Sequence, residues 1–207
     1  KCDELILGKT DADSRALTYQ RLLGKPLVAL AAIFQHSPSV LLTRRDSGIE
    51  SVHDLMGKKV MLMNMTEDAD FLSMFLSEDV SLSQVKIMPS SYDINDLISG
   101  KVDAFNSYTT NEPYLLKQRN IAYNIIDPST YRIDFYSDIL FTSEAELRDH
   151  PKRVEAMRRA TLKGWRYAMD HPDEIITLLL DKYHVEKTRE HLEFEAAEMR
   201  KLIFPNL

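Results

Sequence analysis

The sequence is poor in several features that would assign it to a class of protein. Its 207 residues contain a single cysteine, Cys2, so they form no internal disulfide and no cysteine-rich zinc site. Positive charge is not in excess, since 26 Lys and Arg against 32 Asp and Glu give a formal net charge of −6. Binding of nucleic-acid phosphates needs the opposite balance, so nucleic acid is not a predicted partner.

Long apolar runs are also missing. The longest such stretch, residues 26–34, is much shorter than the roughly 18 apolar residues that a membrane-spanning helix needs. The sequence starts at Lys1, with no Met and no recognisable signal peptide, in what reads as the middle of a domain. We therefore expect a piece of a longer protein, and a membrane association only through that parent.

Enzyme signatures are scarce. The sequence contains no G-x-S-x-G, H-E-x-x-H, G-x-G-x-x-G or phosphate-binding glycine loop. Its six histidines are dispersed, and the pair His184 and His191 near Glu195 fits a solvated helical face better than a metal site. We predict no catalytic residue, no metal and no cofactor, and we expect this domain not to be an enzyme.

What the sequence does contain is an alternation of short strands and helices. The hydrophobic fraction of 44% and the charged fraction of 28% are typical of a globular protein. The apolar run at 27–34 predicts a strand buried on both faces. Further strands are predicted near 40–43, 59–64, 85–88, 102–105 and 123–126, with helices between them. This pattern indicates an α/β fold with largely parallel sheets.

The last third of the sequence is predicted to be helical. Asp149-His150-Pro151 and Asp170-His171-Pro172 each place an Asp near a helix N-cap and a Pro in the first turn. Between these two motifs, apolar residues recur at the spacing of one helical stripe. We expect three consecutive helices from residue 151 onward.

Candidate binding residues lie where predicted strands end. Gln35 and His36 follow the buried strand at 27–34, and Asn64 joins a strand to a helix. Tyr92 opens a helix after Ser90 and Ser91. Each has an ordinary alternative: hydrogen bonding within a loop, helix capping by neighbouring residues, or packing.

Two polar segments offer more chemistry. Residues 106–113 are irregular and follow a strand end, where open α/β sheets bind ligands, and they contribute Tyr108, Asn111 and Glu112. The second segment, residues 134–138, contributes Tyr136 and Asp138. Aromatic faces beside carboxylates suit a cationic or amino-bearing ring. Helix capping before Pro113 and a strand edge with alternating faces are the respective alternatives.

Several stretches together resemble one bacterial family. They include VALAAIFQHSP at 28–38, NEPY at 111–114 and KGWRYA at 163–168, with further matches at 54–60, 91–93, 100–104, 133–136 and 140–144. The sequence resembles the periplasmic substrate-binding domains related to thiamine-pyrimidine synthesis proteins and to sulfonate and nitrate receptors. It lacks the cysteine-rich motif of the true synthase members, since Cys2 is its only cysteine.

The resemblance implies a fold, a division of the chain into lobes and a truncation of the domain. It implies a two-lobed periplasmic-binding-protein fold of type II, the Venus flytrap, with the ligand between the lobes and hinge closure as the mechanism. Lobe one would hold residues 1–45 and 137–207, and lobe two residues 46–136. Family members begin further upstream and continue beyond residue 207, so the domain is expected to be truncated at both ends.

The resemblance also implies a function. We expect an extracytoplasmic ligand-sensing domain of an inner-membrane signalling protein, a two-component histidine kinase or a diguanylate cyclase, that binds a small polar or heteroaromatic solute in the periplasm. The alternative is the substrate-binding protein of an ABC importer for pyrimidine or thiamine precursors or for sulfonate- or nitrate-like solutes. A synthase with a lysine Schiff base and a purely structural dimerisation module are two further alternatives, and the partner to consider besides the solute is a second copy of the chain in a homodimer.

Overall fold

The chain divides into two units in the computed structural model, which describes residues 14–63 and 68–205. Unit 2 is the continuous segment Pro38–Asp134, and unit 1 combines the segments before and after it. The sequence suggested a first boundary after residue 45. The structure places it between Ser37 and Pro38, because strand β2 (Ser39–Arg44) is hydrogen-bonded between two strands of unit 2.

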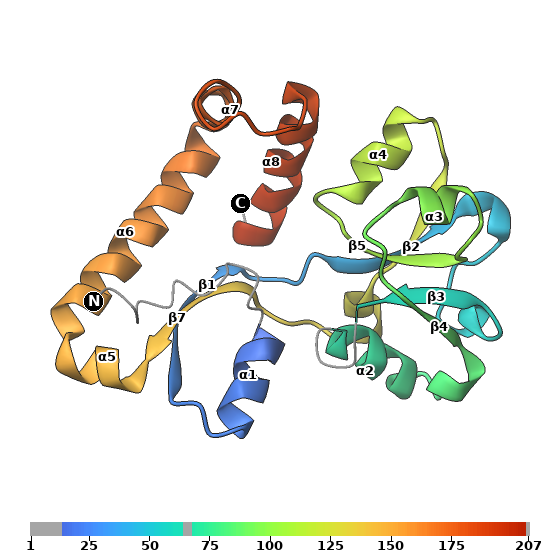
Figure 1. Cartoon of the computed structure of the whole chain (residues 1–207), viewed down its shortest axis with the longest axis horizontal. Helices are drawn as coiled ribbons and strands as arrows, with labels where there is room; N and C mark the ends of the chain where they lie inside the picture. The colour runs from blue at the N-terminus through green and yellow to red at the C-terminus, as the bar shows by residue number, and fades with distance from the viewer. Residues whose placement is uncertain (1–13, 64–67, 206–207) are drawn as a thin grey trace. The chain divides into compact units, whose positions relative to one another are not determined.

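Unit 2 is built on a five-stranded sheet of order β4-β3-β5-β2-β6 (Figure 1). Besides β2, its strands are β3 (Lys59–Leu62), β4 (Lys86–Pro89), β5 (Ala104–Tyr108) and β6 (Tyr123–Ile126). Strand β3 runs parallel to β4 and β5, whereas β2 runs antiparallel to β5 and β6. The expectation of a largely parallel sheet is therefore wrong for β2, which enters unit 2 from unit 1 and runs against its neighbours.

Helices cover both faces of this sheet. Helix α2 (Ala69–Ser77) buries Phe71, Met74 and Phe75 in one apolar cluster, as their helical spacing predicts. Helices α3 (Asn95–Ile98) and α4 (Glu112–Gln118) contribute to a second cluster.

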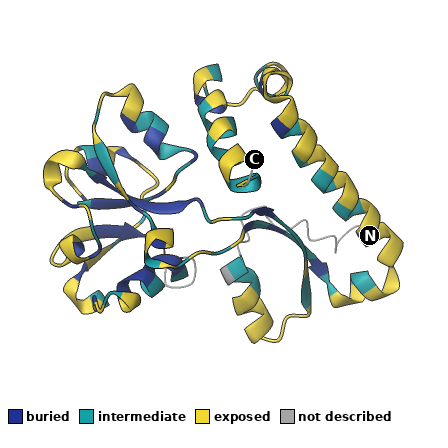
Figure 2. Cartoon of the chain, turned by 180° about the vertical axis from the view of Figure 1, so that it is seen from behind, coloured by how far each residue is buried: buried dark blue, intermediate teal, exposed yellow. Residues whose placement is uncertain are grey.

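The central strand β2 belongs to both clusters. Leu41 packs in the first and Leu42 in the second, and neither side chain has any exposed surface. Successive side chains of a strand point to opposite faces, so an uninterrupted apolar strand is the expected signature of a sheet covered on both sides. Figure 2 shows the buried residues of unit 2 along these strands.

Unit 1 has a smaller sheet and most of the helices. Strand β1 (Leu27–Phe34) pairs antiparallel with β7 (Ser137–Ser143). The helices are α1 (Ser14–Leu22), α5 (Glu144–Asp149), α6 (Pro151–Asp170), α7 (Pro172–Asp181) and α8 (Arg189–Ile203). The three helices expected from residue 151 are confirmed.

The repeated Asp-His-Pro motif ends one helix and begins the next. Pro151 and Pro172 take the first turn of α6 and α7, as predicted. Asp149 and Asp170 lie near the N-caps, as predicted, but the N-cap positions themselves are occupied by His150 and His171, and the two Asp residues are the last residues of the preceding helices. The motif is therefore a junction between consecutive helices.

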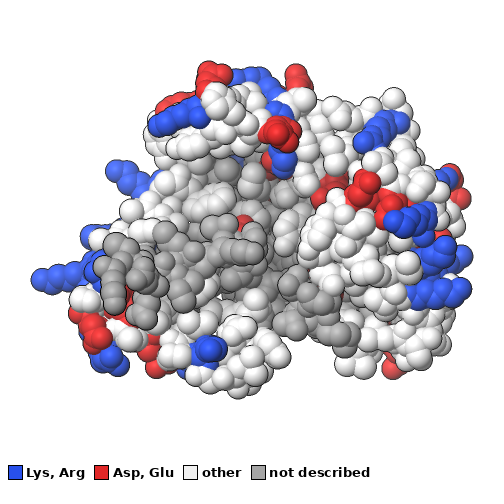
Figure 3. Space-filling model, in the orientation of Figure 1, with Lys and Arg blue, Asp and Glu red and all other residues white. Residues whose placement is uncertain are grey.

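On the face seen in Figure 3, charge of neither sign dominates. Figure 3 shows Lys and Arg interspersed with Asp and Glu on the visible face, outside the grey region. Within residues 14–63 and 68–205, no helix is both long enough and apolar enough to cross a membrane.

Candidate functional site

The carboxyl ends of three parallel strands bring several predicted residues to one edge of the unit 2 sheet. Because β3 is parallel to both β4 and β5, all three strands end at this edge. Asn64 follows β3 and lies outside the described residues, while Tyr92 follows β4 and Tyr108 ends β5. Loops at the carboxyl ends of strands are the usual ligand-binding position in open α/β sheets. We call the described residues Tyr92, Tyr108, Asn111 and Glu112 the edge cluster.

Glu112 organises the loop after β5. Its Oε2 accepts hydrogen bonds from the hydroxyl of Ser107 at 2.8 Å and from the backbone N–H of Tyr108 at 3.0 Å, and its Oε1 accepts one from Asn111 Nδ2 at 2.8 Å. Glu112 is also the first residue of α4, where a negative charge is favoured by the helix dipole. The carboxylate thus fixes the loop that carries Tyr108, which is 46% exposed.

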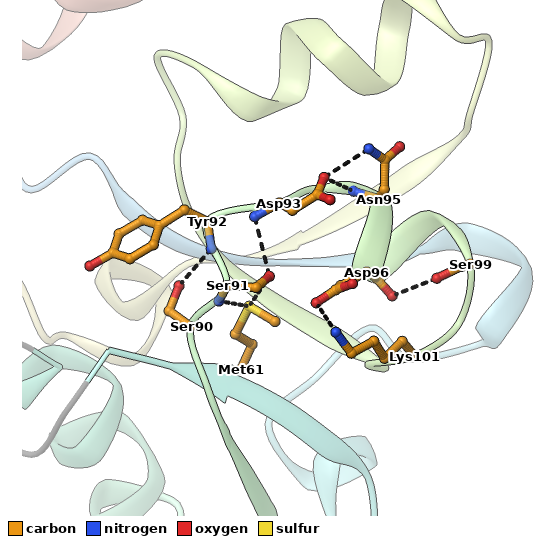
Figure 4. Close-up of polar contacts among 9 residues, drawn as sticks. All are labelled: Met61, Ser90, Ser91, Tyr92, Asp93, Asn95, Asp96, Ser99 and Lys101. Atoms are coloured by element: carbon orange, nitrogen blue, oxygen red, sulfur yellow. Dashed lines mark hydrogen bonds and ion pairs between the residues drawn. The ribbon is translucent and has the colours of Figure 1, made fainter.

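Tyr92 occupies a turn after β4 in a backbone conformation that is unusual for a tyrosine. Its φ is +58°, in the left-handed region, and its side chain is 76% exposed. A residue with a Cβ pays roughly 1–2 kcal/mol for this conformation. Figure 4 shows the ring pointing away from the hydrogen-bonded turn. Because burial of the ring does not offset the backbone cost, Tyr92 is a candidate for a functional role.

A polar network holds this turn in place (Figure 4). Ser91 contacts the sulfur of Met61 through its backbone N–H at 3.4 Å, and its hydroxyl accepts from the N–H of Asp93 at 3.2 Å. Lys101 Nζ lies 2.8 Å from Asp96 Oδ2. Hydrogen bonds from Lys101 and from Ser91 hold the pKa of Asp96 below its ordinary value.

Two buried acids at the start of α2 were not predicted as site residues. Asp68 is 3% exposed and Asp70 is 1% exposed, and both flank the first residue of the helix. Buried carboxylates are uncommon, and the N-terminus of a helix favours them. The sequence showed an acidic helix start, but only the structure shows that these side chains are buried.

The remaining predicted residues gather in unit 1. Phe34 pairs with Ser137, so Gln35, His36, Tyr136 and Asp138 all lie at one end of the β1–β7 pair. We call these four residues the strand-end cluster.

The residues of the strand-end cluster differ in their hydrogen bonds, exposure and backbone conformation. Gln35 donates from its backbone to the carbonyl of Leu202 at 2.9 Å and from Nε2 to the carbonyl of Ala32 at 3.0 Å. His36 is exposed, Tyr136 is 54% exposed, and Asp138 has a left-handed φ of +50°. The structure therefore gathers the described candidates into two groups, one in each unit.

Unit 2 also carries a wide surface depression of about 990 Å³ at the other end of β2. Arg45, Lys117 and Tyr123 line it, and Tyr123 pairs with Arg44, whereas Tyr108 pairs with Ser39. The depression therefore does not coincide with the edge cluster. Its lining contains one acidic residue, Glu50, and one aromatic residue, Tyr123.

Known proteins resemble this chain in sequence and fold. It is 24% identical over 188 residues to the formylaminopyrimidine-binding protein of Halalkalibacterium halodurans, covering 86% of this chain and 57% of that protein. It is 22% identical over 167 residues to the riboflavin-binding protein RibY of Chloroflexus aurantiacus, covering 77% and 46% respectively. The chain thus spans about half the length of these relatives.

Solved structures show the same fold at lower identity. The periplasmic aliphatic sulphonate binding protein SsuA from Escherichia coli superposes with a TM-score of 0.67 at 13% identity, covering 90% of this chain and 60% of that one. The fold is therefore of the periplasmic-binding-protein type, as expected. The sequence model of the family described as NMT1/THI5 like matches residues 8–175. With most of its length matched, the chain belongs to the NMT1/THI5-like family.

Proposed function

We propose that this chain binds a small polar or heteroaromatic solute and that the edge cluster supplies the main contacts from unit 2. The observation that carries the proposal is the combination of Tyr92 and Tyr108, both exposed, with the Glu112 carboxylate at the carboxyl ends of the parallel strands β3, β4 and β5. An aromatic face beside a fixed acceptor can hold a ring by stacking and orient it by a hydrogen bond. The strand-end cluster of unit 1 is a second candidate binding position, proposed independently of the first.

The charge of the candidate residues favours an amino-bearing solute over an anion. A carboxylate offers about four acceptor positions, and three hydrogen bonds to Glu112 come from Ser107, Tyr108 and Asn111. This leaves acceptor capacity for a solute N–H. Asp138 is a further acidic residue, in the strand-end cluster. A relative that is named for binding a formylaminopyrimidine supports the same class of solute.

The larger role that we propose is a periplasmic sensor region of a membrane-bound signalling protein. Solute binding would shift an equilibrium between two conformations, and only a difference in affinity for the two states can do so; a shift from 1:99 to 99:1 needs about 5.5 kcal/mol. The receptor of an ABC importer is the second candidate. It is favoured by the likeness to relatives and solved structures that are named as binding proteins.

Equilibrium titration tests the binding proposal. Wild-type protein, Tyr108→Ala and Tyr183→Ala are titrated with an aminopyrimidine and with an alkanesulfonate. Tyr183 is an exposed tyrosine of unit 1 outside both clusters and serves as the matched control. We expect the aminopyrimidine to bind, with a several-fold loss of affinity in Tyr108→Ala alone, since one aromatic contact contributes about 1 kcal/mol. Binding of the sulfonate without the amine contradicts the proposed charge preference.

The sensor and importer roles separate at the level of the whole gene product. A membrane helix followed by a kinase or cyclase domain supports the sensor, and solute-dependent activity of that output domain in vesicles confirms it. A gene product that ends after the binding domain and stimulates solute uptake through a permease contradicts the sensor and supports the importer.

A further inference from the structure

Helix α6 is basic although the chain as a whole is acidic. Its 20 residues contain six Lys and Arg against one Glu and one Asp, a charge of +4, whereas the whole chain has a formal net charge of −6. Four of these cations are exposed and lie on one side of the helix. They are Lys152, Arg159, Lys163 and Arg166, and we call them the basic stripe.

The geometry of the helix places the basic stripe on the side away from the sheet of unit 1. An α-helix turns by about 100° and rises by about 1.5 Å per residue, so the four cations fall within about 60° of one another over about 21 Å. Val154, which is buried, and Trp165, whose ring lies 6.1 Å from that of Phe34 in β1, are about 100° or more away from every one of them. Figure 3, in the orientation of Figure 1, shows Lys and Arg side chains along the outer side of the region that α6 occupies.

The stability of α6 does not account for the basic stripe. The first turn of a helix favours negative charge, and α5, α7 and α8 all carry acidic residues there. The first turn of α6 contains no acidic residue, and Lys152 lies in it instead. Arg159 and Lys163 are four positions apart, a spacing at which like charges on a helix repel. Both arrangements cost stability, which indicates that the cations act on something outside the helix.

The two acidic residues of α6 are held by other cations. Glu155 accepts hydrogen bonds of 3.0 and 3.1 Å from Arg158, with Arg159 nearby. Asp170 Oδ1 lies 3.7 Å from Arg200 Nη1 of α8. Within residues 14–63 and 68–205, no member of the basic stripe hydrogen-bonds to a carboxylate. The positive charge of the stripe is therefore available to a partner.

The shape of the basic stripe indicates an extended partner. Side chains on the outer side of a helix diverge, so the four cations form a row and do not converge on one small anion. The exposed residues beside the row include Ala156 and Ala160, which offer little for a protein partner to bury, whereas protein interfaces depend on large anchoring side chains. Anionic phospholipid headgroups present many negative charges on one surface and need no such anchor.

We propose that the basic stripe of α6 is a docking surface for an anionic phospholipid membrane, in addition to any anchor in the parent protein. This inference rests on the periplasmic location proposed above, which places the chain beside a membrane. Docking through α6 would hold unit 1 against the headgroups by charge alone. Both the edge cluster and the strand-end cluster lie outside α6.

Sedimentation with lipid vesicles tests the docking surface. We expect the protein to sediment with vesicles of equimolar phosphatidylcholine and phosphatidylglycerol at about 0.1 M NaCl, and to stay in solution with phosphatidylcholine alone. Raising NaCl to about 1 M shortens the Debye length from about 10 Å to about 3 Å and should release the bound protein. Equal sedimentation with both compositions overturns the proposal, and so does a lack of sedimentation with either.

A pair of double variants makes the test specific to α6. Lys152→Gln/Lys163→Gln removes two charges from the stripe, and Lys25→Gln/Lys182→Gln removes two from exposed lysines of unit 1 outside α6. Because each cation near an anionic membrane contributes about fivefold to binding, we expect the stripe variant to bind the anionic vesicles about tenfold or more weakly and the control to stay within about twofold of wild type. Equal losses in the two variants overturn the proposal.

Two further measurements separate this proposal from its neighbours. The stripe variant should bind an aminopyrimidine as wild type does, so vesicle binding and solute binding can fail independently. Soluble polyglutamate tests an acidic polypeptide as the occupant. Binding to polyglutamate that is lost in Lys152→Gln/Lys163→Gln, without binding to anionic vesicles, overturns the membrane in favour of an acidic protein segment.

Discussion

The Oε2 atom of Glu112 lies 3.0 Å from the backbone nitrogen of Tyr108 and accepts its hydrogen bond. This contact joins the last residue of β5 to the first residue of α4. The backbone that carries the exposed Tyr108 side chain is thereby hydrogen-bonded in place. Such preorganisation lowers the entropic cost of binding, because fewer loop conformations are lost.

Glu112→Gln tests this organising role. Glutamine replaces one acceptor oxygen by an N–H₂ group, which faces the donors on Ser107, Tyr108 or Asn111. A donor left without an acceptor costs about 1–3 kcal/mol, so we expect the free energy of unfolding to fall by that amount in urea titrations. Glu50→Gln, at an exposed residue of the same unit, is the control and should change it little. Equal effects of the two substitutions would contradict the organising role.

Substitutions of Tyr92 distinguish its effect on stability from its effect on binding. Because its φ is +58°, glycine at this position avoids the steric cost that a Cβ imposes. We expect Tyr92→Gly to be more stable than Tyr92→Ala by about 1 kcal/mol in thermal or urea unfolding. Both variants should bind the solute more weakly than wild type. A Tyr92→Ala variant that binds as well as wild type would show that the ring has no role in recognition.

We expect Asp96 to make the free energy of unfolding depend on pH in the acidic range. Its pKa is lowered in the folded protein by hydrogen bonds from Lys101 and Ser91, so the unfolded state takes up a proton first as the pH falls. The stabilisation is therefore fully present above the ordinary carboxyl range near pH 4 and is lost as the pH drops through the lowered pKa. We expect Asp96→Asn to flatten the fall in stability below about pH 4, measured by urea unfolding at several pH values. A profile identical to wild type would refute the contribution of Asp96.

A buried and an exposed residue of helix α2 together test the packing of the unit 2 core. Met74 has no exposed surface, whereas Leu76 is 79% exposed. We expect Met74→Ala to lower the free energy of unfolding by about 2–5 kcal/mol through lost burial and a residual cavity. Leu76→Ala should change it by less than about 0.5 kcal/mol, as is usual for surface substitutions. Similar losses in both variants would mean that α2 does not pack as described.

Much of the secondary structure could be predicted because it depends on local patterns. The strands 27–34 and 123–126 have the predicted bounds, and α2 buries the apolar triplet that its helical spacing indicates. The direction of β2 could not be predicted. Its apolar run is the same for a parallel and an antiparallel strand, and only its pairing with β5 and β6 distinguishes them.

The candidate site was predictable to the extent that it lies at strand ends. Tyr108, Asn111 and Glu112 lie within five positions of one another in the sequence, so their proximity follows from the loop itself. The left-handed conformation of Tyr92 and the burial of Asp70 could not be foreseen, because both depend on contacts between distant segments. Met61, which contacts Ser91 across 30 positions of sequence, is an example of such a contact.

A thermal melt of the protein against a panel of small solutes tests the central claim most directly. The panel contains aminopyrimidines, other amino-bearing heteroaromatics, polyamines and alkanesulfonates. At about 100 times its dissociation constant a solute stabilises the folded state by roughly 2.7 kcal/mol, which corresponds to a rise in Tm on the order of 5–10 °C for a domain of this size. We expect such a rise with an amino-bearing heteroaromatic. A rise with sulfonates alone would contradict the proposed solute class, and no rise with any solute in the panel would contradict the binding function.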